Sequence, residues 1–437
     1  MKTYAICGLS SRAIGHFALP LIGNPKLPEY GDYSAHGRLV AILDLDPERV
    51  AAFNQNQGCS IPYYPADAFD RMMAETKPDV VVVTSSDVHH ATYIIAALRH
   101  HRDVIAEKPM VINGEQARAV IEAERASRGR VRVAHNYRYT PLHKAIKRMI
   151  LDGRLGRIVH AQMIYLLDTY HGSSYFYRWN RDRAMSGGLT VTKGCHHFDL
   201  LNWWLDDVPE EVFAFGTRNY YGSESPYNPS RQKGHELTVD EQKDRCPYHL
   251  RWNVQGVRPP KDDHLRAHEA AFSLPMKAQY PRALGLYDKE IAIEDTYSAT
   301  ICYRGGASAI YSLNASSPWE GYILGIQGTH GRLETTHYVA PSRCPFPADE
   351  RQTITYYPMF GERQIHEVRH VEGGHGGADD VLKYDMFVAP GPESEELKIA
   401  AGTREGALAV AVGEAVWRSV AEKKPMKITD LLGGDVG

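Results

Sequence analysis

The sequence has no strong excess of charge of either sign, no long apolar run and no paired cysteine spacing. Its 50 Lys and Arg residues nearly balance 53 Asp and Glu residues, for a formal net charge of −3. This balance gives no electrostatic basis for binding nucleic acid or an acidic membrane. No apolar run approaches the ~20 residues that span a bilayer. The first residues lack the apolar region and cleavage site of a signal peptide, so we expect a cytoplasmic protein without a membrane segment.

The six cysteines are scattered: Cys7, Cys59, Cys195, Cys246, Cys302 and Cys344. None shows the C-x-x-C spacing of a zinc site, so we expect reduced thiols and no metal. Tyrosine, in contrast, is common, with 26 residues. A tyrosine ring has an apolar face and a polar tip, which suits either a wet pocket for a polar ligand or a large amphipathic surface. Composition does not distinguish these two interpretations.

The 437 residues are too many for one ordinary core, so two domains are expected. Residues 1–138 alternate short apolar runs, such as TYAIC, RLVAILD and VVVV, with helical patterns. This rhythm predicts right-handed βαβ units and a parallel sheet. Residues 139–437 form the second domain. They have longer runs with few helices between them, which predict a largely antiparallel sheet. The polar segment 219–290 is too long for a plain loop and is interpreted as an insertion, either covering a site or forming a surface or oligomer contact.

A glycine and an aspartate indicate dinucleotide binding in the first domain. Gly8 ends the first predicted strand, and a helix that begins just after it would present free N–H groups to a pyrophosphate. The glycine fingerprint is degenerate, with Ser10 and Ala13 in the later positions, while Arg12 could add charge for phosphate. Asp44 ends the second strand, where a carboxylate binds a ribose diol and repels a 2′-phosphate. This favours NAD over NADP, although Asp44 could instead cap a helix.

A lysine lies where the nicotinamide would be expected. Glu107, Lys108 and Pro109 follow the fifth strand. An unpaired buried ammonium is costly, so lysine at a buried strand end is rare for structural reasons alone. A desolvated lysine can have a lowered pKa and act as an acid or base.

The chain resembles the Gfo/Idh/MocA oxidoreductases in four segments: VVVTSSDVHHATYIIAALRHHRDVIAEKP, NYRYTP, SGGLTVTKGCHHFDLLNWW and IQGTHGRLE. The resemblance implies an α/β protein. An N-terminal Rossmann dinucleotide-binding domain would be followed by an α/β domain with an open, mostly antiparallel sheet, through which copies of the chain would form a homo-oligomer. It also implies hydride transfer between NAD(P) and a hydroxyl of a sugar, inositol or related compound. Lys108 would hydrogen-bond that hydroxyl, Lys108–Pro109 would be a cis peptide, and His196 would be the second catalytic group.

The expected cofactor-binding residues are Gly8, Ser10, Ser11, Arg12, Asp44, Thr84, Ser85, His90, Glu107 and Lys108. The expected catalytic residues are Lys108, His196, Tyr137 and Lys193. The expected substrate-binding residues are Arg138, His197, Asp199 and His375.

The segment around His196 departs from the family pattern. Many relatives with a plain dehydrogenase role carry an aspartate four residues before the histidine, and this chain has Thr192 followed by Lys193. Lys193 could lower the pKa of a neighbouring acid or base, hold an anionic substrate group, or simply be a surface lysine. Asp199 lies three residues after His196, on the same helical face, and could orient the imidazole or only favour the helix dipole. His196 and His197 are adjacent and cannot both face one pocket from a regular helix, so a substrate-binding and a structural role remain equally open for His197.

Three functions remain open from the sequence. The first is an NAD-dependent dehydrogenase acting on a ring hydroxyl, C3 by expectation, of a sugar or glycoside. The second is a redox-neutral glycoside hydrolase that retains NAD and uses oxidation, elimination, water addition and re-reduction, with Tyr137 as a candidate base. The third, ranked last, is a non-catalytic NAD-binding sensor. The sequence does not identify the sugar, its anomer or any anionic group on it.

Overall fold

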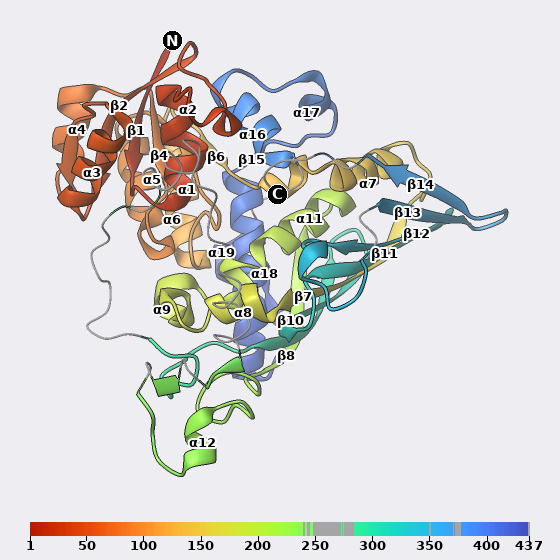
Figure 1. Ribbon diagram of the computed structural model, residues 1–437. Helices are drawn as coiled ribbons and strands as arrows, with labels where there is room; N and C mark the ends of the chain where they lie inside the picture. Colours follow the sequence, from red (N-terminus) through yellow and green to blue (C-terminus); the bar gives the residue numbers. More distant parts are fainter. Residues whose placement is uncertain are drawn as a thin grey trace. The chain divides into compact units, whose positions relative to one another are not determined.

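The computed structural model describes residues 1–238, 241–242, 245–247, 272, 274, 284–348, 351–369, 371 and 377–435. The chain divides into two compact units (Figure 1). Unit 1 comprises residues 1–140, 258–278 and 371–407, and unit 2 comprises residues 141–257, 279–370 and 408–437. None of the described helices combines the length and apolar character needed to cross a lipid bilayer.

Unit 1 is built on a seven-stranded sheet in the order β15-β6-β5-β4-β1-β2-β3. All neighbouring strands are parallel except β15 and β6. Its strands are β1 (Lys2–Cys7), β2 (Gly37–Asp44), β3 (Tyr63–Pro65), β4 (Val80–Val83), β5 (Asp103–Ala106), β6 (Val131–Val133) and β15 (Ala401–Gly402). Its α-helices are α1 (Ser11–Ala13), α2 (Leu19–Ile22), α3 (Pro47–Gln57), α4 (Phe69–Thr76), α5 (His90–Arg99), α6 (Gly114–Arg125), α16 (Ala378–Phe387) and α17 (Pro392–Glu396). The other helical turns are the π-helix η1 (Ile14–Ala18) and the 3-10 turns η2 (Pro28–Tyr30), η3 (Asp87–His89) and η4 (Asn136–Tyr139).

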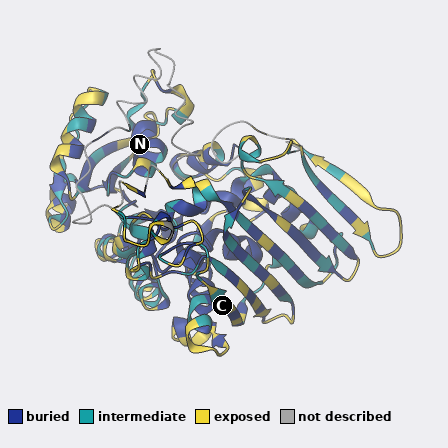
Figure 2. Cartoon of the chain, turned by 60° about the horizontal axis from the view of Figure 1, so that its bottom comes forward, coloured by how far each residue is buried: buried dark blue, intermediate teal, exposed yellow. Residues whose placement is uncertain are grey.

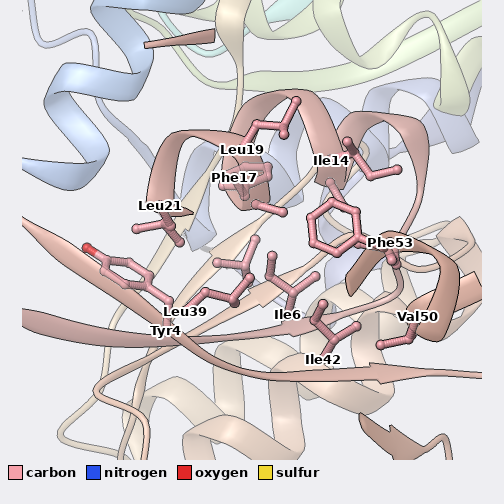
Figure 3. Packing of buried hydrophobic residues seen from close by; sticks show 14 of the residues in the cluster. Tyr4, Ile6, Ile14, Phe17, Leu19, Leu21, Leu39, Ile42, Val50 and Phe53 are labelled. Atoms are coloured by element: carbon pink, nitrogen blue, oxygen red, sulfur yellow. The ribbon is translucent and has the colours of Figure 1, made fainter. Parts of the chain in front are cut away.

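The core of unit 1 lies between its sheet and the helices that cover it. Figure 3 shows side chains of β1 and β2 facing those of the α1–η1–α2 segment and of α3. Valines fill β4 completely and are buried at every position, as expected for a strand covered on both faces. Strand β4 pairs in parallel with β1, so their carboxyl ends are neighbours. The strand order reverses at that point, which is where ligands bind in open parallel sheets.

Unit 2 is built on a nine-stranded sheet in the order β14-β13-β12-β11-β7-β10-β9-β8-β16. Its strands are β7 (Ile158–Asp168), β8 (Pro209–Thr217), β9 (Thr296–Tyr303), β10 (Ser308–Ser317), β11 (Gly321–Gly328), β12 (Gly331–Tyr338), β13 (Gln352–Pro358), β14 (Gln364–Val368) and β16 (Met426–Lys427). Its helical elements are α7 (Pro141–Leu151), α8 (Thr169–Ser174), η5 (Trp179–Arg181), α9 (Arg183–Ser186), α10 (Leu189–Thr192), α11 (Cys195–Leu205), α12 (Pro229–Lys233), η6 (Pro341–Arg343) and α19 (Ile428–Leu432). Helix α18 (Thr403–Glu422) begins in unit 1 and ends in unit 2.

The larger sheet is mostly antiparallel, as predicted, and only β7 and β10 pair in parallel. Its strands alternate buried and exposed residues, which appear as stripes across the sheet in Figure 2. Strands β11 and β12 pair as an antiparallel hairpin, because residues 329–330 turn the chain back on itself. Strands β13 and β14 were not predicted.

Most of the segment 219–290 lies outside the described residues, so its predicted covering role is untested. Its base is fixed on unit 2 by the buried carboxylate of Asp295, which accepts hydrogen bonds from the backbone N–H groups of Asn219, Tyr220 and Tyr221. The Tyr221 ring also stacks on Phe176, with ring centroids 4.0 Å apart. The insertion therefore starts from a rigid, buried stem.

Candidate active site

The turn after β1 has the backbone that a phosphate-binding loop needs. Gly8 has a φ of +94°, and a Cβ there would lie 2.5 Å from the Cα of Ser85. Only glycine fits this position, because both the left-handed φ and the close approach exclude a side chain. The Ser10 hydroxyl caps the next helix by accepting from the N–H of Ala13 at 3.1 Å, and Ser11 is its first residue. Thr84 at the end of β4 donates to the Gly8 carbonyl at 2.6 Å.

Asp44 at the end of β2 holds this loop from the other side. Its Oδ2 accepts the Leu9 N–H at 2.6 Å, and its Oδ1 accepts the Asp46 N–H at 2.9 Å. Asp46 is the residue that caps α3, accepting from two N–H groups, so the capping interpretation of Asp44 is wrong. Each carboxylate oxygen can accept a second hydrogen bond, which leaves Asp44 able to bind a ribose hydroxyl.

Arg12 does not offer a free charge for phosphate, contrary to the sequence interpretation. Its Nε donates to Glu107 Oε1 at 2.7 Å, and its Nη2 lies 3.4 Å from Asp379 Oδ1. Burial alone would raise the pKa of Glu107, but the Arg12 guanidinium, with smaller contributions from Lys108 and His16, lowers it. Arg12 therefore ties the phosphate loop to the end of β5 and to α16. The two acidic partners lie 95 and 367 residues away in sequence, so no local signal could have indicated them.

The end of β5 carries the lysine predicted to act on the substrate. The Lys108–Pro109 peptide is cis, as expected. The Glu107 carboxylate accepts the Lys108 N–H at 3.1 Å. His90, which is almost completely buried, bridges the Pro109 carbonyl at 2.8 Å and the Ser85 carbonyl at 3.0 Å. His90 thus fixes the two strand ends beside Gly8 and supports the cofactor loop indirectly.

These residues fit an NAD molecule. The loop has the space that only glycine leaves, a helix N-terminus follows it, and Asp44 at the end of β2 would accept hydrogen bonds from the ribose hydroxyls. NAD would supply a hydride acceptor or donor there.

Tyr137 and Arg138 lie in the 3-10 turn η4 and are both buried. The Arg138 Nη1 lies 3.4 Å from the carbonyl oxygens of Lys398 and Ile399. This nitrogen therefore holds the backbone of residues 398–399, which argues against the predicted substrate-binding role of Arg138. Tyr137 stays a candidate proton carrier.

In unit 2, the residues around His196 form two short helices, α10 and α11, joined at Lys193 and Gly194. The Thr190 hydroxyl donates to the Gly413 carbonyl of α18 at 2.7 Å, which fixes α10 against that helix. His196 and Asp199 lie on α11 and are only 4% and 1% exposed. Both remain candidates at the positions expected of them.

His197 is a core residue. It is completely buried, its ring stacks on Tyr165 with centroids 3.8 Å apart, and its Nδ1 lies 2.8 Å from the Tyr311 hydroxyl. Tyr165 and Tyr311 belong to β7 and β10, so His197 fixes α11 on the sheet. The predicted substrate-binding role of His197 has no support in this arrangement. His375 lies outside the described residues.

Lys193 is not a surface lysine. Its side chain is only 4% exposed, its Nζ lies 3.9 Å from Glu320 Oε1, and it lies 5.0 Å from the centroid of the Tyr165 ring. The chain thus places a paired cation three residues before His196. Its acidic partner, Glu320, comes from the turn between β10 and β11.

The sequence did not indicate Glu320 or the network of charged side chains that surrounds it. Its Oε1 also accepts from His171 Nδ1 at 2.8 Å, and its Oε2 accepts from Arg343 Nη2 at 2.7 Å. Burial alone would raise the pKa of Glu320, but the hydrogen bond from His171 and the charges of Lys193 and Arg343 lower it to about 2. The only sequence signal was a single acid within the apolar run PWEGYIL, which is weak evidence. Within the described residues, no group of three or more His, Cys, Asp or Glu side chains could hold a metal ion.

Comparison with known proteins agrees with this geometry. Residues 2–135 match the Gfo/Idh/MocA description "Oxidoreductase family, NAD-binding Rossmann fold", and residues 147–428 match "Oxidoreductase family, C-terminal alpha/beta domain". The chain is 45% identical over 435 residues to YteT of Bacillus subtilis (strain 168), which carries the name of an oxidoreductase; 99% of each chain is covered. It is 29% identical over 185 residues to an inositol 2-dehydrogenase of Rubrobacter xylanophilus, covering 41% of this chain and 48% of that protein.

A levoglucosan dehydrogenase, solved with NADH and levoglucosan, has the same fold, with a TM-score of 0.64, 15% identity and coverage of 98% of this chain and 99% of that one. The glycine turn, the cis Lys-Pro bond and the two matched regions agree in their assignment. The chain belongs to the Gfo/Idh/MocA family of oxidoreductases and carries that family's NAD-binding Rossmann domain.

Proposed function

We propose that this protein moves a hydride between a ring hydroxyl of a sugar or glycoside, at C3, and NAD. The observation that carries the proposal is the buried ammonium of Lys193. Lys193 lies three residues before His196 and is paired with Glu320. Burying an ammonium together with its carboxylate partner costs desolvation energy, and perturbed titratable groups of this kind cluster at functional sites. The names of the inositol and levoglucosan dehydrogenases are consistent with a polyhydroxy substrate.

The residues of this chain have separate roles in the proposed reaction. Asp44 and the Gly8 turn bind the cofactor, and NAD supplies the hydride acceptor. Lys108 donates a hydrogen bond to the reacting hydroxyl, and His196 is the second group that orients it. Lys193 places a positive charge beside His196, which favours the alkoxide character that develops on the oxygen as its proton leaves.

The direct test is a panel of sugars and glycosides, including myo-inositol, D-glucose, levoglucosan and p-nitrophenyl glycosides, assayed with NAD. Formation of NADH and release of p-nitrophenol are recorded together. We expect steady NADH formation with at least one member. Lys108→Ala should abolish turnover while NAD binding, measured by calorimetry, persists. Lys26→Ala, at an exposed position of unit 1, is the matched control and should retain activity. Wild-type rates in Lys108→Ala would remove this lysine from the mechanism.

One observation favours the redox-neutral glycosidase as a second candidate. Arg49 donates through Nε to the Leu9 carbonyl of the cofactor loop at 2.6 Å, and its Nη1 lies 3.4 Å from the Leu274 carbonyl in the insertion. Phe272 packs beside Tyr30, with ring centroids 5.6 Å apart. An insertion tied to the loop would slow exchange of NAD, as a retained cofactor requires. This candidate predicts p-nitrophenol release without net NADH and NAD that stays bound through purification.

We further propose that the open face of the larger sheet binds a second copy of the chain. The strand registers place Phe213, Phe215, Ile310, Ile164 and Ile323 on one face, and each is at least 37% exposed. An exposed apolar face that crosses several strands is typical of an interface between copies. Phe215→Asp should convert the oligomer to a monomer in analytical ultracentrifugation. A wild-type protein that sediments as a monomer would contradict this proposal.

A further inference from the structure

A histidine outside the expected site residues lies in the Glu320 network. His171 is in helix α8, which follows β7 and packs against β7 and β10. Asp168 caps this helix by accepting the His171 N–H at 2.8 Å, and the same carboxylate accepts from Arg343 Nε at 2.6 Å. Asp168 and Glu320 are each 1% exposed. Two buried carboxylates therefore fix both the backbone and the ring of His171.

The hydrogen bonds determine which ring nitrogen of His171 carries the proton. Glu320 is ionised, so it can only accept, and the His171 Nδ1 must donate to it. In the neutral ring, the lone pair is then on Nε2. The Tyr175 hydroxyl lies 3.3 Å from Nε2 and can donate to it. A carboxylate that orients a neutral imidazole in this way is the arrangement that acid–base catalysis uses.

Burial, assisted by the charge of Lys193, keeps the His171 ring neutral near pH 7. Burial and the Lys193 ammonium lower its pKa, while the Glu320 and Asp168 carboxylates oppose this. The other groups that face the cluster are Arg343, which binds both carboxylates, and the Tyr175 hydroxyl. The His171 side chain is nevertheless 35% exposed, in contrast to the 4% of Lys193. His171 thus combines a fixed tautomer with access for a ligand.

We propose that His171 is the general base of the reaction, that its Nε2 accepts the proton of the substrate hydroxyl, and that Glu320 is its positioning residue. In the balanced step, the O–H bond breaks and its proton goes to Nε2. The C–H bond breaks with its electron pair as a hydride to NAD, and a C=O bond forms. Glu320 stabilises the resulting imidazolium, which returns the proton to water. This proposal rests on the proposed function and names the base that it leaves open.

The first experiment reads the tautomer without requiring turnover. Protein labelled with 15N-histidine is titrated by NMR in the presence of NAD, and His171→Gln identifies the His171 signals by difference. We expect a protonated Nδ1, an unprotonated Nε2 and a pKa below the usual histidine value. Adding the panel sugar that supports turnover should shift the Nε2 signal. A protonated Nε2 at pH 7, or no shift with that sugar, would overturn the proposal.

The second experiment measures the pH dependence of kcat/KM. His171→Gln should lower kcat/KM about 100-fold, within the usual range for loss of an acid–base group, and remove the acid limb of the profile. Glu320→Gln should move that limb to lower pH, because the carboxylate stabilises the imidazolium; a merely structural role would not move it. His160→Gln is the matched control, since His160 is a histidine of β7, the strand that precedes α8, and its Nδ1 lies 3.1 Å from the Ser308 hydroxyl rather than near a carboxylate.

The outcomes separate this proposal from the proposed function. Unchanged kcat/KM and acid limb in His171→Gln would overturn the role of His171 and leave the dehydrogenase intact. A wild-type protein that turns over none of the sugars or glycosides would overturn the proposed function and, with it, a catalytic role for His171. The NMR titration would then still decide whether the oriented imidazole exists.

Discussion

Replacing Glu320 by Gln should destabilise unit 2 in a pH-dependent way. The carboxylate is 1% exposed, and its pKa is lowered from 4.5 to about 2 in the folded protein. A shift of this size corresponds to about 3 kcal/mol of stability at neutral pH, since each pKa unit is worth about 1.4 kcal/mol. Gln keeps the shape but resembles the protonated acid, so Glu320→Gln should lose about this amount at pH 7.

The sign of the pH dependence follows from the direction of the pKa shift. Because the folded pKa of Glu320 is lowered, its contribution is fully present above pH 4.5 and is lost as the pH falls through about 2. The difference in unfolding free energy between wild type and Glu320→Gln should therefore shrink to about half by pH 3.

Tryptophan fluorescence provides an assay specific to the unit that contains Glu320. All six tryptophans, Trp179, Trp203, Trp204, Trp252, Trp319 and Trp417, belong to unit 2. Urea unfolding followed by fluorescence at pH 7, 5 and 3 therefore reports that unit, even if the whole chain does not unfold in two states. Glu362→Gln, at an exposed position, is the control and should change stability little. A difference for Glu320→Gln that is below about 1 kcal/mol at pH 7, or that does not depend on pH, would refute the reasoning.

Three further changes test unit 1. Asp44→Ala should weaken NAD binding and improve tolerance of NADP in calorimetric titrations, because the carboxylate no longer repels a 2′-phosphate; an unaltered preference would place the ribose elsewhere. Gly8→Ala should abolish NAD binding, since its Cβ would lie 2.5 Å from the Ser85 Cα at a φ of +94°; retained affinity would contradict the tight fit. Arg12→Met should cost about 3–5 kcal/mol in urea unfolding and raise the pKa of the buried Glu107 carboxyl; wild-type stability would show that the ion pair is not needed.

The sequence was sufficient for features that depend on local chemistry. The valine-rich β4 and the Gly8 turn follow from burial and conformational freedom within a few residues. The cis bond at Lys108–Pro109 was indicated by the family resemblance and not by local chemistry.

Pairings between distant residues could not be predicted in the same way. The sequence does not decide between a functional and a surface position for Lys193. Its partner, Glu320, follows another strand and lies 127 positions later in the chain. The two acids that bind Arg12 are similarly remote. The face that His197 presents depends on how α11 packs against Tyr165 and Tyr311, which no local pattern specifies.

Unit 1 is assembled from separate stretches of the chain, which affects when it can fold during synthesis. Strand β15 pairs with β6, and Phe387 of α16 packs into the same core cluster as Tyr4 and Phe17. During synthesis, the cofactor-binding half therefore stays incomplete until nearly the last part of the chain has left the ribosome. A fragment cut at residue 140 would expose that core, so grafting this half onto another protein requires two junctions or more, never one.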